Sequence, residues 1–180
     1  MLTYIIMDTS GIMETSSSSE VHPLYDKWVF WAHLPHDTDW SLKSYKKIMT
    51  VKSIEEMVAL YSVIPEKLVK NCMLFIMREG VNPLWEDKHN RLGGCFSFKV
   101  SNKVVPQVWK NLSYTLVGET LTNDVRLQRI INGVTISPKK SFCIIKVWLK
   151  NCNMQNPAQL TPIKGLSIHG CLFKKHKIGY

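Results

Sequence analysis

Apolar residues recur along this chain with two periods, and each period predicts a type of element. Alternation with a period of two, or a short continuous apolar run, predicts strands. Five segments have this pattern: Trp28–Leu34, Cys72–Met77, Cys95–Val100, Ile130–Ser137 and Phe142–Leu149. The last two flank Pro138-Lys139-Lys140, which predicts a hairpin with a basic tip. Leu172–Ile178 is a weaker candidate for a final strand because it is rich in Lys.

Apolar residues at every third or fourth position predict helices. The first helix begins at the capping-box signature Ser53-x-x-Glu56, and Pro65 limits it. Its apolar positions are Ile54, Met57, Val58 and Tyr61. The second has the stripe Val105, Val108, Trp109, Leu112 and Leu116 and stops at Gly118. Thr161-Pro162 predicts a short third helix, with Thr as N-cap and Pro at the first helical position.

Strand runs joined by hairpins, with helices between some of them, predict an α+β fold in which helices back one face of a curved antiparallel sheet. A chain of 180 residues suits one domain. Residues 1–20 end in the polar run Ser16–Ser19, so we expect a flexible tail there and a single folded domain over 21–180.

Composition predicts the kind of partner from the net charge and the redox environment from the cysteines. The net charge of +9 suits a polyanionic partner, although solubility alone also explains a surplus of Lys. The five cysteines have no C-x-x-C spacing, and the six histidines supply no matching set, so we expect neither metal nor cofactor. An odd cysteine count without a signal peptide predicts reduced thiols in the cytoplasm. Leu2–Met7 is too short to span a membrane.

Two of the six tryptophans stand in polar surroundings. Trp28, Trp31 and Trp109 share strand or helix faces with other apolar residues, which predicts core packing. Trp40, by contrast, follows Asp37-Thr38-Asp39, and Trp85 lies within the loop 82–87. A large aromatic side chain in such a loop either folds back as a lid on the core or is displayed for a ligand.

Several short motifs, in this order along the chain, resemble the eukaryotic translation initiation factor 4E family of messenger-RNA cap-binding proteins. They are His22-Pro23-Leu24 with Trp28 and Trp31, Ala59-Leu60-Tyr61, Pro83-x-Trp85-Glu86-Asp87, Gly93-Gly94, Trp109, Gly118-Glu119, Ile131–Trp148, Cys152 and Ile178-Gly179-Tyr180. The resemblance spans 22–180. It implies a curved antiparallel sheet with helices on its convex face and a cap slot on the concave side.

The resemblance also implies a site for 7-methylguanosine. Trp40 and Trp85 would stack on the base, Glu86 would read its guanine edge, and Trp148 would lie against the N7-methyl group. Without this resemblance, Glu86 would be interpreted as a solvated loop acid or as a charge at the start of a helix. We expect Asp87 to brace the loop rather than touch the base.

For the triphosphate of the cap, Lys139 occupies the place of a family Arg. A second family cation is replaced by Ile144, and Cys95 stands where the family often has an Arg. Because strand side chains alternate, Lys146 shares a face with Ile144 and Trp148 and is a second phosphate candidate, unless it is an ordinary surface Lys.

The family binds a scaffold of the initiation factor 4G type across its helical face. The residues expected to form this partner surface are His22, Pro23, Leu24, Ile54, Val58 and Tyr114. Val58 replaces an exposed Trp, and Lys110-Asn111 replaces a Leu-Glu pair, so a divergent scaffold is the alternative. Val58 as plain core is equally consistent with the helical stripe.

These features predict a non-enzymatic protein that binds the messenger-RNA cap in translation initiation through a scaffold partner. A cap-binding repressor or cap-protecting competitor is the first alternative, because the scaffold surface is altered. An enzyme of cap metabolism is less consistent with the sequence, which has neither a clustered-Glu helix nor a Gly-rich nucleotide loop. A general RNA-binding module that uses the positive charge alone is the last alternative.

Overall fold

A computed structural model describes residues 20–176 of the chain. Seven strands form one antiparallel sheet in the order β2-β1-β3-β5-β6-β4-β7. Their bounds are β1 Pro23–His33, β2 Tyr45–Ser53, β3 Met73–Arg78, β4 Gly94–Ser101, β5 Ile131–Pro138, β6 Phe142–Leu149 and β7 Leu172–Lys175. The predicted tail, apart from residue 20, and the last two residues of the predicted final strand lie outside the described part.

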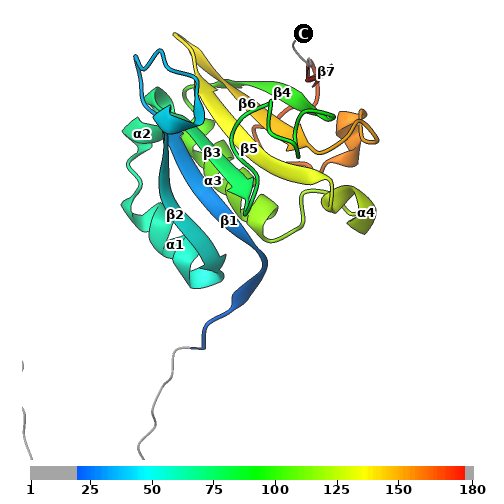
Figure 1. The fold of residues 1–180 in the computed structure, drawn as a ribbon, viewed down its shortest axis with the longest axis horizontal. Helices are drawn as coiled ribbons and strands as arrows, with labels where there is room; N and C mark the ends of the chain where they lie inside the picture. Colours follow the sequence, from blue (N-terminus) through cyan, green and yellow to red (C-terminus); the bar gives the residue numbers. More distant parts are fainter. Residues whose placement is uncertain (1–19, 177–180) are drawn as a thin grey trace, which may run out of the picture.

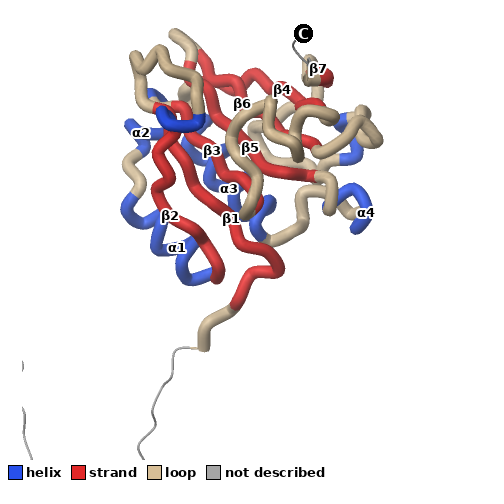
Figure 2. Tube along the Cα trace, in the orientation of Figure 1, coloured by secondary structure: helices blue, strands red, loops and turns tan. Residues whose placement is uncertain are grey.

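The sheet has helices on one side, which we call the helical face; the other side is the open face. The helices are α1 Ile54–Val63, α2 Glu66–Asn71, α3 Val105–Val117 and the short α4 Val125–Gln128. Helices α1 to α3 lie behind the twisted sheet in the view of Figure 1, and Figure 2 shows the same two layers by element type. The predicted α+β class and single antiparallel sheet are confirmed.

The main core lies between the sheet and the helices. Alternation along β1 directs Trp28 and Phe30 into this core, where they meet Trp109 of α3, and all three side chains are buried. Burial of such an aromatic side chain stabilises the fold by roughly 2–3 kcal/mol. Trp31 points the other way and is half-buried in a smaller apolar cluster on the open face, around Phe75. Core packing was therefore correct for Trp28 and Trp109, but Trp31 packs outside the main core.

Helix α1 begins where the capping box predicts. The Glu56 N–H donates to the Ser53 hydroxyl oxygen at 3.2 Å. The Glu56 carboxylate does not close the box on Ser53; it accepts from the Lys52 N–H at 2.6 Å. Met57 is buried, whereas Val58 is 54% exposed, so the interpretation of Val58 as core is wrong.

The predicted helix at Thr161-Pro162 is also wrong. The Thr161 hydroxyl donates to the Thr120 carbonyl at 2.6 Å and its N–H donates to the Leu121 carbonyl, so its polar groups are used across the chain rather than as a cap. A short 3₁₀ helix forms earlier instead, at Pro157–Gln159, with Asn156 as its N-cap. The N-cap and Pro signals were in the sequence, but at this earlier position.

Candidate functional site: an aromatic slot on the open face

A hollow of about 190 Å³ opens between two loops and the sheet on the open face. We call it the slot. Four predicted base-binding residues line it together with one predicted phosphate residue: Trp40, Trp85, Glu86, Trp148 and Lys146. Its remaining lining residues are Tyr45, Met73, Phe75, Pro83 and Leu84. The structure thus brings together side chains from loops more than 40 residues apart and from β6.

Trp40 forms one side of the slot and is held by a buried histidine. Its indole ring stacks on His33, with 4.3 Å between ring centroids and 4° between ring planes. His33 is buried, and its Nε2 lies 2.9 Å from the Asp39 carbonyl oxygen, which ties the loop to β1. With one ring face covered, Trp40 still has 58% of its surface exposed. Trp40 is therefore displayed rather than folded into the core.

Asp39 stabilises the same loop from within. Its carboxylate accepts hydrogen bonds from the N–H of Ser41 at 2.8 Å and from the Ser41 hydroxyl at 2.9 Å. These hydrogen bonds to the charged form lower the pKa of Asp39 below its ordinary value. The turn that leads from Trp40 into β2 is therefore fixed by an ionised side chain.

Trp85 forms a second part of the slot wall, on a loop that Asp87 braces as expected. The Asp87 carboxylate accepts from the His89 N–H at 2.8 Å and from the Asn82 side-chain amide at 2.9 Å. Burial alone would raise the pKa of Asp87, but hydrogen bonds from His89 and Asn82 outweigh it, so this pKa lies below its ordinary value. The Asp87 carboxylate is thus used for hydrogen bonds within the loop.

Buried amides complete the support of the Trp85 loop. Asn90 is fully buried, and its side-chain amide donates to the carbonyls of Asn82 at 3.0 Å and Leu84 at 2.8 Å. Asn132 of β5 donates in turn to the Asn90 side-chain oxygen at 2.9 Å. Since an unpaired buried amide is costly, this network fixes the loop in one conformation relative to the sheet.

Glu86 lies exposed at the rim of the slot, next to Trp85. Within residues 20–176 its carboxylate has no ion-pair or hydrogen-bond partner. Its negative charge nevertheless acts on a residue inside the slot. Burial, together with the negative charge of Glu86, raises the pKa of Tyr45 to about 12. Glu86 is therefore a free acceptor beside two exposed indole rings.

Trp148 of β6 lies deeper and is 6% exposed. Its neighbour is His176, with ring centroids 5.0 Å apart. His176 Nδ1 lies 2.7 Å from the Asn90 carbonyl oxygen. Burial, and secondarily the positive charge of Lys146, lowers the pKa of His176, against the opposing hydrogen bond to Asn90 and the charge of Glu86. His176 therefore lies within electrostatic reach of both charged slot residues.

The two predicted phosphate residues occupy different places. Lys146 lines the slot, because the alternation along β6 directs it to the same face as Trp148. Lys139 is exposed at the β5–β6 turn and does not line the slot. The main-chain N–H of Lys139 donates to the Phe142 carbonyl at 2.8 Å, which closes the hairpin. The structure therefore separates the two lysines rather than grouping them.

Sequence reasoning missed several residues that build the slot. Tyr45, Phe75 and His33 support the aromatic wall, and His176 flanks Trp148. The alternation of side chains along the predicted strand 72–77 could have assigned Phe75 to the open face. His33 and His176 lie within predicted strands, Trp28–Leu34 and Leu172–Ile178, but nothing in the sequence placed them at the slot, and Tyr45 lies outside the predicted elements.

An almost entirely apolar hollow of about 290 Å³ lies on the helical face. It brings together four of the predicted partner residues, Leu24, Ile54, Val58 and Tyr114, with Met57, Val117 and Gly118. His22 lies beside it, with Nδ1 2.7 Å from a Glu55 carboxylate oxygen, and this hydrogen bond lowers the pKa of Glu55 to about 2. Pro23 pairs with Ser53 at the end of the sheet.

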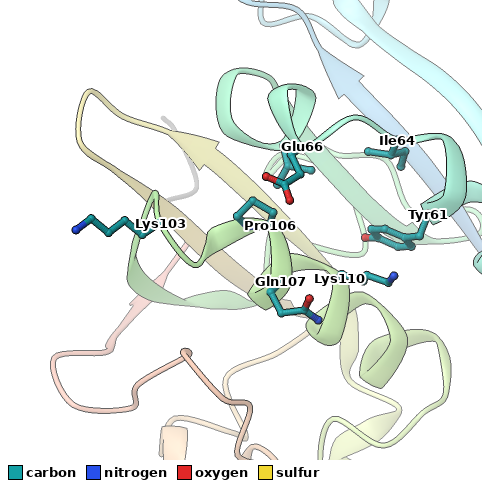
Figure 3. Close-up of a pocket in the computed structure, with 8 residues that line it drawn as sticks. Tyr61, Ile64, Glu66, Lys103, Pro106, Gln107 and Lys110 are labelled. Carbon is teal, nitrogen blue, oxygen red and sulfur yellow. The ribbon is translucent and has the colours of Figure 1, made fainter.

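Figure 3 shows a second hollow on this face, of about 280 Å³, between α2 and α3. Tyr61, Glu66, Lys103, Gln107 and Lys110 are among its lining residues. Lys110 Nζ lies 5.7 Å from the ring centroid of Tyr114 and 6.0 Å from that of Tyr61. Tyr114 lines the first hollow and Tyr61 the second, so Lys110 marks the boundary between them.

Residues 20–176 contain neither a membrane-spanning helix nor a cluster of metal ligands. No helix there is both long and apolar enough to cross a membrane. No group of three or more His, Cys, Asp and Glu side chains in the same range is arranged to hold a metal ion. Of the five cysteines, Cys72, Cys95 and Cys143 are buried as free thiols, in line with a packing role.

The seven-stranded sheet thus carries two separate hollows, an aromatic slot on one face and an apolar hollow on the other. Residues 23–180 match the family model for eukaryotic initiation factor 4E. Factor 4E-1 of Schizosaccharomyces pombe is 32% identical over 139 residues, which cover 73% of this chain, and the Saccharomyces cerevisiae factor is 30% identical over 156 residues, or 80% of it. The chain therefore belongs to the eukaryotic initiation factor 4E family.

The matched region spans 62% of the S. pombe relative and 51% of a homologue from Acanthamoeba polyphaga mimivirus, less than two thirds of either protein. Solved structures share the fold. An Ascaris suum eIF4E-3 complex with m2,2,7G cap superposes with a TM-score of 0.71 at 19% identity, covering 89% of this chain and 94% of that one. A schistosome eIF4E complex with m7GpppG and 4E-BP gives 0.67 at 22% identity, covering 74% of each chain.

Proposed function

We propose that this protein binds the 7-methylguanosine cap of messenger RNA in the slot, with the base between Trp40 and Trp85. The observation that carries the proposal is the slot itself: two exposed indole rings and an unpartnered carboxylate line one hollow of about 190 Å³. Family membership supports it and argues against an enzyme of cap metabolism. The cap ligands in the related worm and schistosome structures support it further.

The aromatic walls suit a methylated guanine for a physical reason. Methylation at N7 gives the base a positive charge, and indole rings attract a flat cation by stacking and by cation–π forces. Stacking on an aromatic side chain contributes roughly 1–3 kcal/mol per base but tolerates any base. Trp40 and Trp85 therefore supply affinity and a preference for the methylated form, and another group must recognise guanine.

Glu86 supplies that recognition in our proposal. An ionised carboxylate accepts two parallel hydrogen bonds from guanine N1–H and N2–H, and the cationic ring strengthens both. Adenine lacks this pair of donors, so it would forgo hydrogen bonds to a charged group that contribute roughly 1.5–3 kcal/mol. Trp148 closes the inner end of the slot, near the position that the N7-methyl group would take.

We further propose that the protein acts in translation initiation, with a scaffold of the initiation factor 4G type on its helical face. The apolar hollow around Ile54 and Val58 supports a docked partner, since both side chains are about half exposed. The 4E-binding proteins present in the related structures support the same conclusion. A repressor that binds caps without the common scaffold is the second candidate, favoured by Val58 and Lys110 on this surface.

A comparative titration tests cap binding. Tryptophan fluorescence is followed while 7-methyl-GTP or unmethylated GTP is added, and we expect a preference of at least about tenfold for the methylated form. ATP, which contains adenine and has no N7-methyl group, serves as the control for base recognition and should bind still more weakly. Equal affinity for 7-methyl-GTP and GTP would contradict the proposal and favour a general RNA-binding module.

A further inference from the structure

The open face carries a second lysine beside the slot, on the edge strand β7. Antiparallel pairing places Cys95 of β4 next to Trp148 of β6, and Lys174 of β7 on the other side of Cys95. Directly paired residues in a sheet point to the same face. Lys174 therefore shares the open face with Trp148, and by the same rule so does Lys146, which pairs with Ser97.

Strand spacing puts Lys174 and Lys146 close to the slot and Lys139 far from it. Neighbouring strands lie about 4.8 Å apart, so the Cα of Lys174, two strands from Trp148, is about 10 Å away from it. Lys146 is two residues along β6 from Trp148, or about 7 Å. Lys139 lies beyond Cys143, which is itself about 17 Å along β6 from Trp148.

The residues of β4 between the two near lysines are small and uncharged. Cys95 and Ser97 are small, and their side chains lie together there, with Sγ and Oγ 3.9 Å apart. Within the described residues neither Lys146 nor Lys174 forms an ion pair. Two cations without an ion-pair partner among the described residues thus lie on either side of β4, next to the strand that carries Trp148.

Strand β7 is held in place on β4, which fixes the position of Lys174. Phe173 packs edge-on against Phe96 of the core, with ring centroids 5.4 Å apart. The main chain of β7 approaches Gly94 so closely that a Cβ on this glycine would lie 2.7 Å from the Lys174 carbonyl oxygen. The His176 N–H then donates to the Gly93 carbonyl at 3.0 Å.

We propose that Lys174, together with Lys146, holds the phosphate groups attached to the bound base, so that the triphosphate leaves the slot across β4 towards β7. This inference rests on the proposed function of the slot. It moves the phosphate site away from the hairpin tip at Lys139, because Lys146 and Lys174 lie nearer than Lys139 to Trp148, at the inner end of the slot where the base would bind. Lysine ammonium groups bind phosphate oxygens as point charges, without the fixed geometry of Arg.

The strand itself provides a matched control. Lys175 follows Lys174, pairs with Gly94 and points to the opposite face, so Lys175→Ala removes the same charge from the same strand. Each variant is titrated calorimetrically with 7-methyl-GTP and with 7-methylguanosine, which has the base but no phosphate. Lys174→Ala should weaken 7-methyl-GTP binding about tenfold and leave the affinity for the nucleoside unchanged. Lys175→Ala should bind both ligands with the affinity of the wild type.

The remaining outcomes overturn either the assignment of Lys174 or the proposed binding of the cap in the slot. Equal 7-methyl-GTP affinities for Lys174→Ala and Lys175→Ala would overturn the assignment of Lys174 while leaving cap binding intact. A larger loss of 7-methyl-GTP affinity in Lys139→Ala than in Lys174→Ala would place the phosphates at the hairpin. That result would also overturn the assignment of Lys174 and leave cap binding intact. If the wild type itself does not prefer 7-methyl-GTP over GTP, the proposed function fails and this inference fails with it.

Discussion

Trp40 and Trp85 line the same slot but are held in different ways. Trp40 lies flat on the buried His33 ring, so one of its faces is already covered and its orientation is set before any ligand arrives. Trp85 has no ring stacked on it among the described residues and depends on its loop for position. Fixing an aromatic side chain in advance lowers the entropy cost of binding. Trp40 is thus held by a stacked ring, and Trp85 is held by the hydrogen-bond network of its loop.

At the residue scale, Glu86 gives the sharpest prediction. Glu86→Gln keeps the shape of the side chain but replaces one acceptor oxygen with a donor NH₂, which opposes the guanine N–H groups. We expect the affinity for 7-methyl-GTP to fall by about ten- to a hundredfold, because hydrogen bonds to a charged group contribute roughly 1.5–3 kcal/mol. Calorimetric titration measures this change.

Glu79→Gln is the matched control for this substitution. Glu79 is exposed and pairs with Lys27 at 3.7 Å, away from the slot, so its loss should leave 7-methyl-GTP affinity unchanged. Trp85→Ala should also weaken binding, through lost stacking rather than lost recognition. Full affinity in both Glu86→Gln and Trp85→Ala would show that the base binds elsewhere.

At the scale of elements, the sequence predicted most strands and both long helices but missed β2, α2 and α4. Strand β2 contains three lysines, and a bulge shifts its register against β1 between Phe30 and Trp31, so simple alternation is lost. Helices α2 and α4 have six and four residues, too few for a helical period to show. Long periodic elements could be predicted, and short or bulged ones could not.

The slot was predictable to a similar extent. The loop 82–87 carried a specific motif, so Trp85 and Glu86 could be named in advance. Tyr45 could not, because it reaches the slot only through the pairing of β1 with β2, which depends on long-range contacts. The same limit explains Lys174: its place beside Cys95 follows from the docking of β7 on β4 and not from any nearby residue.

The Trp85 loop should make stability depend on pH through Asp87. The pKa of this carboxyl is depressed in the folded protein, so ionised Asp87 stabilises the fold above its ordinary pKa of 3.8, and that contribution is lost as the pH falls through the lower folded value. Asp87→Asn should lower the free energy of unfolding by about 1–3 kcal/mol near pH 6. The difference from the wild type should shrink below about pH 4.

Urea unfolding at a series of pH values measures this difference. Asp37→Asn is a suitable control, since Asp37 is partly exposed and accepts a single local hydrogen bond from the Asp39 N–H at 3.0 Å. A stability difference for Asp87→Asn that stays constant down to about pH 3 would mean that the carboxylate charge does not brace the loop.

At the scale of the whole molecule, the sheet separates two surfaces. The slot lies on the open face, and the apolar hollow around Ile54 and Val58 lies on the helical face, with the main core between them. Substitutions on one surface away from the core are therefore expected to act independently of those on the other. The two ligands that we propose, an RNA end and a protein partner, would therefore bind on opposite faces of the sheet.

This arrangement predicts that Val58→Asp abolishes capture of a scaffold partner but leaves 7-methyl-GTP affinity unchanged. The aspartate places a charge in an apolar hollow, whereas Val58 is 54% exposed, so the fold itself should lose little stability. Pull-down with fragments of 4G-type scaffolds measures capture. Val63→Asp is the matched control, because Val63 ends the same helix, is 73% exposed and does not line the hollow. Equal capture by both variants would place the partner elsewhere.

The unequal burial of the six tryptophans divides the intrinsic emission of the protein into a buried and an exposed population, with the half-buried Trp31 between them. Trp28 and Trp109 have no exposed surface, and Trp148 has very little, so a dissolved quencher such as acrylamide reaches them poorly. Trp40 and Trp85 are open to solvent at 58% and 39%. A ligand between these two rings would shield the quenchable population alone, so the accessible fraction of the emission reports occupancy of the slot independently of any change in total intensity.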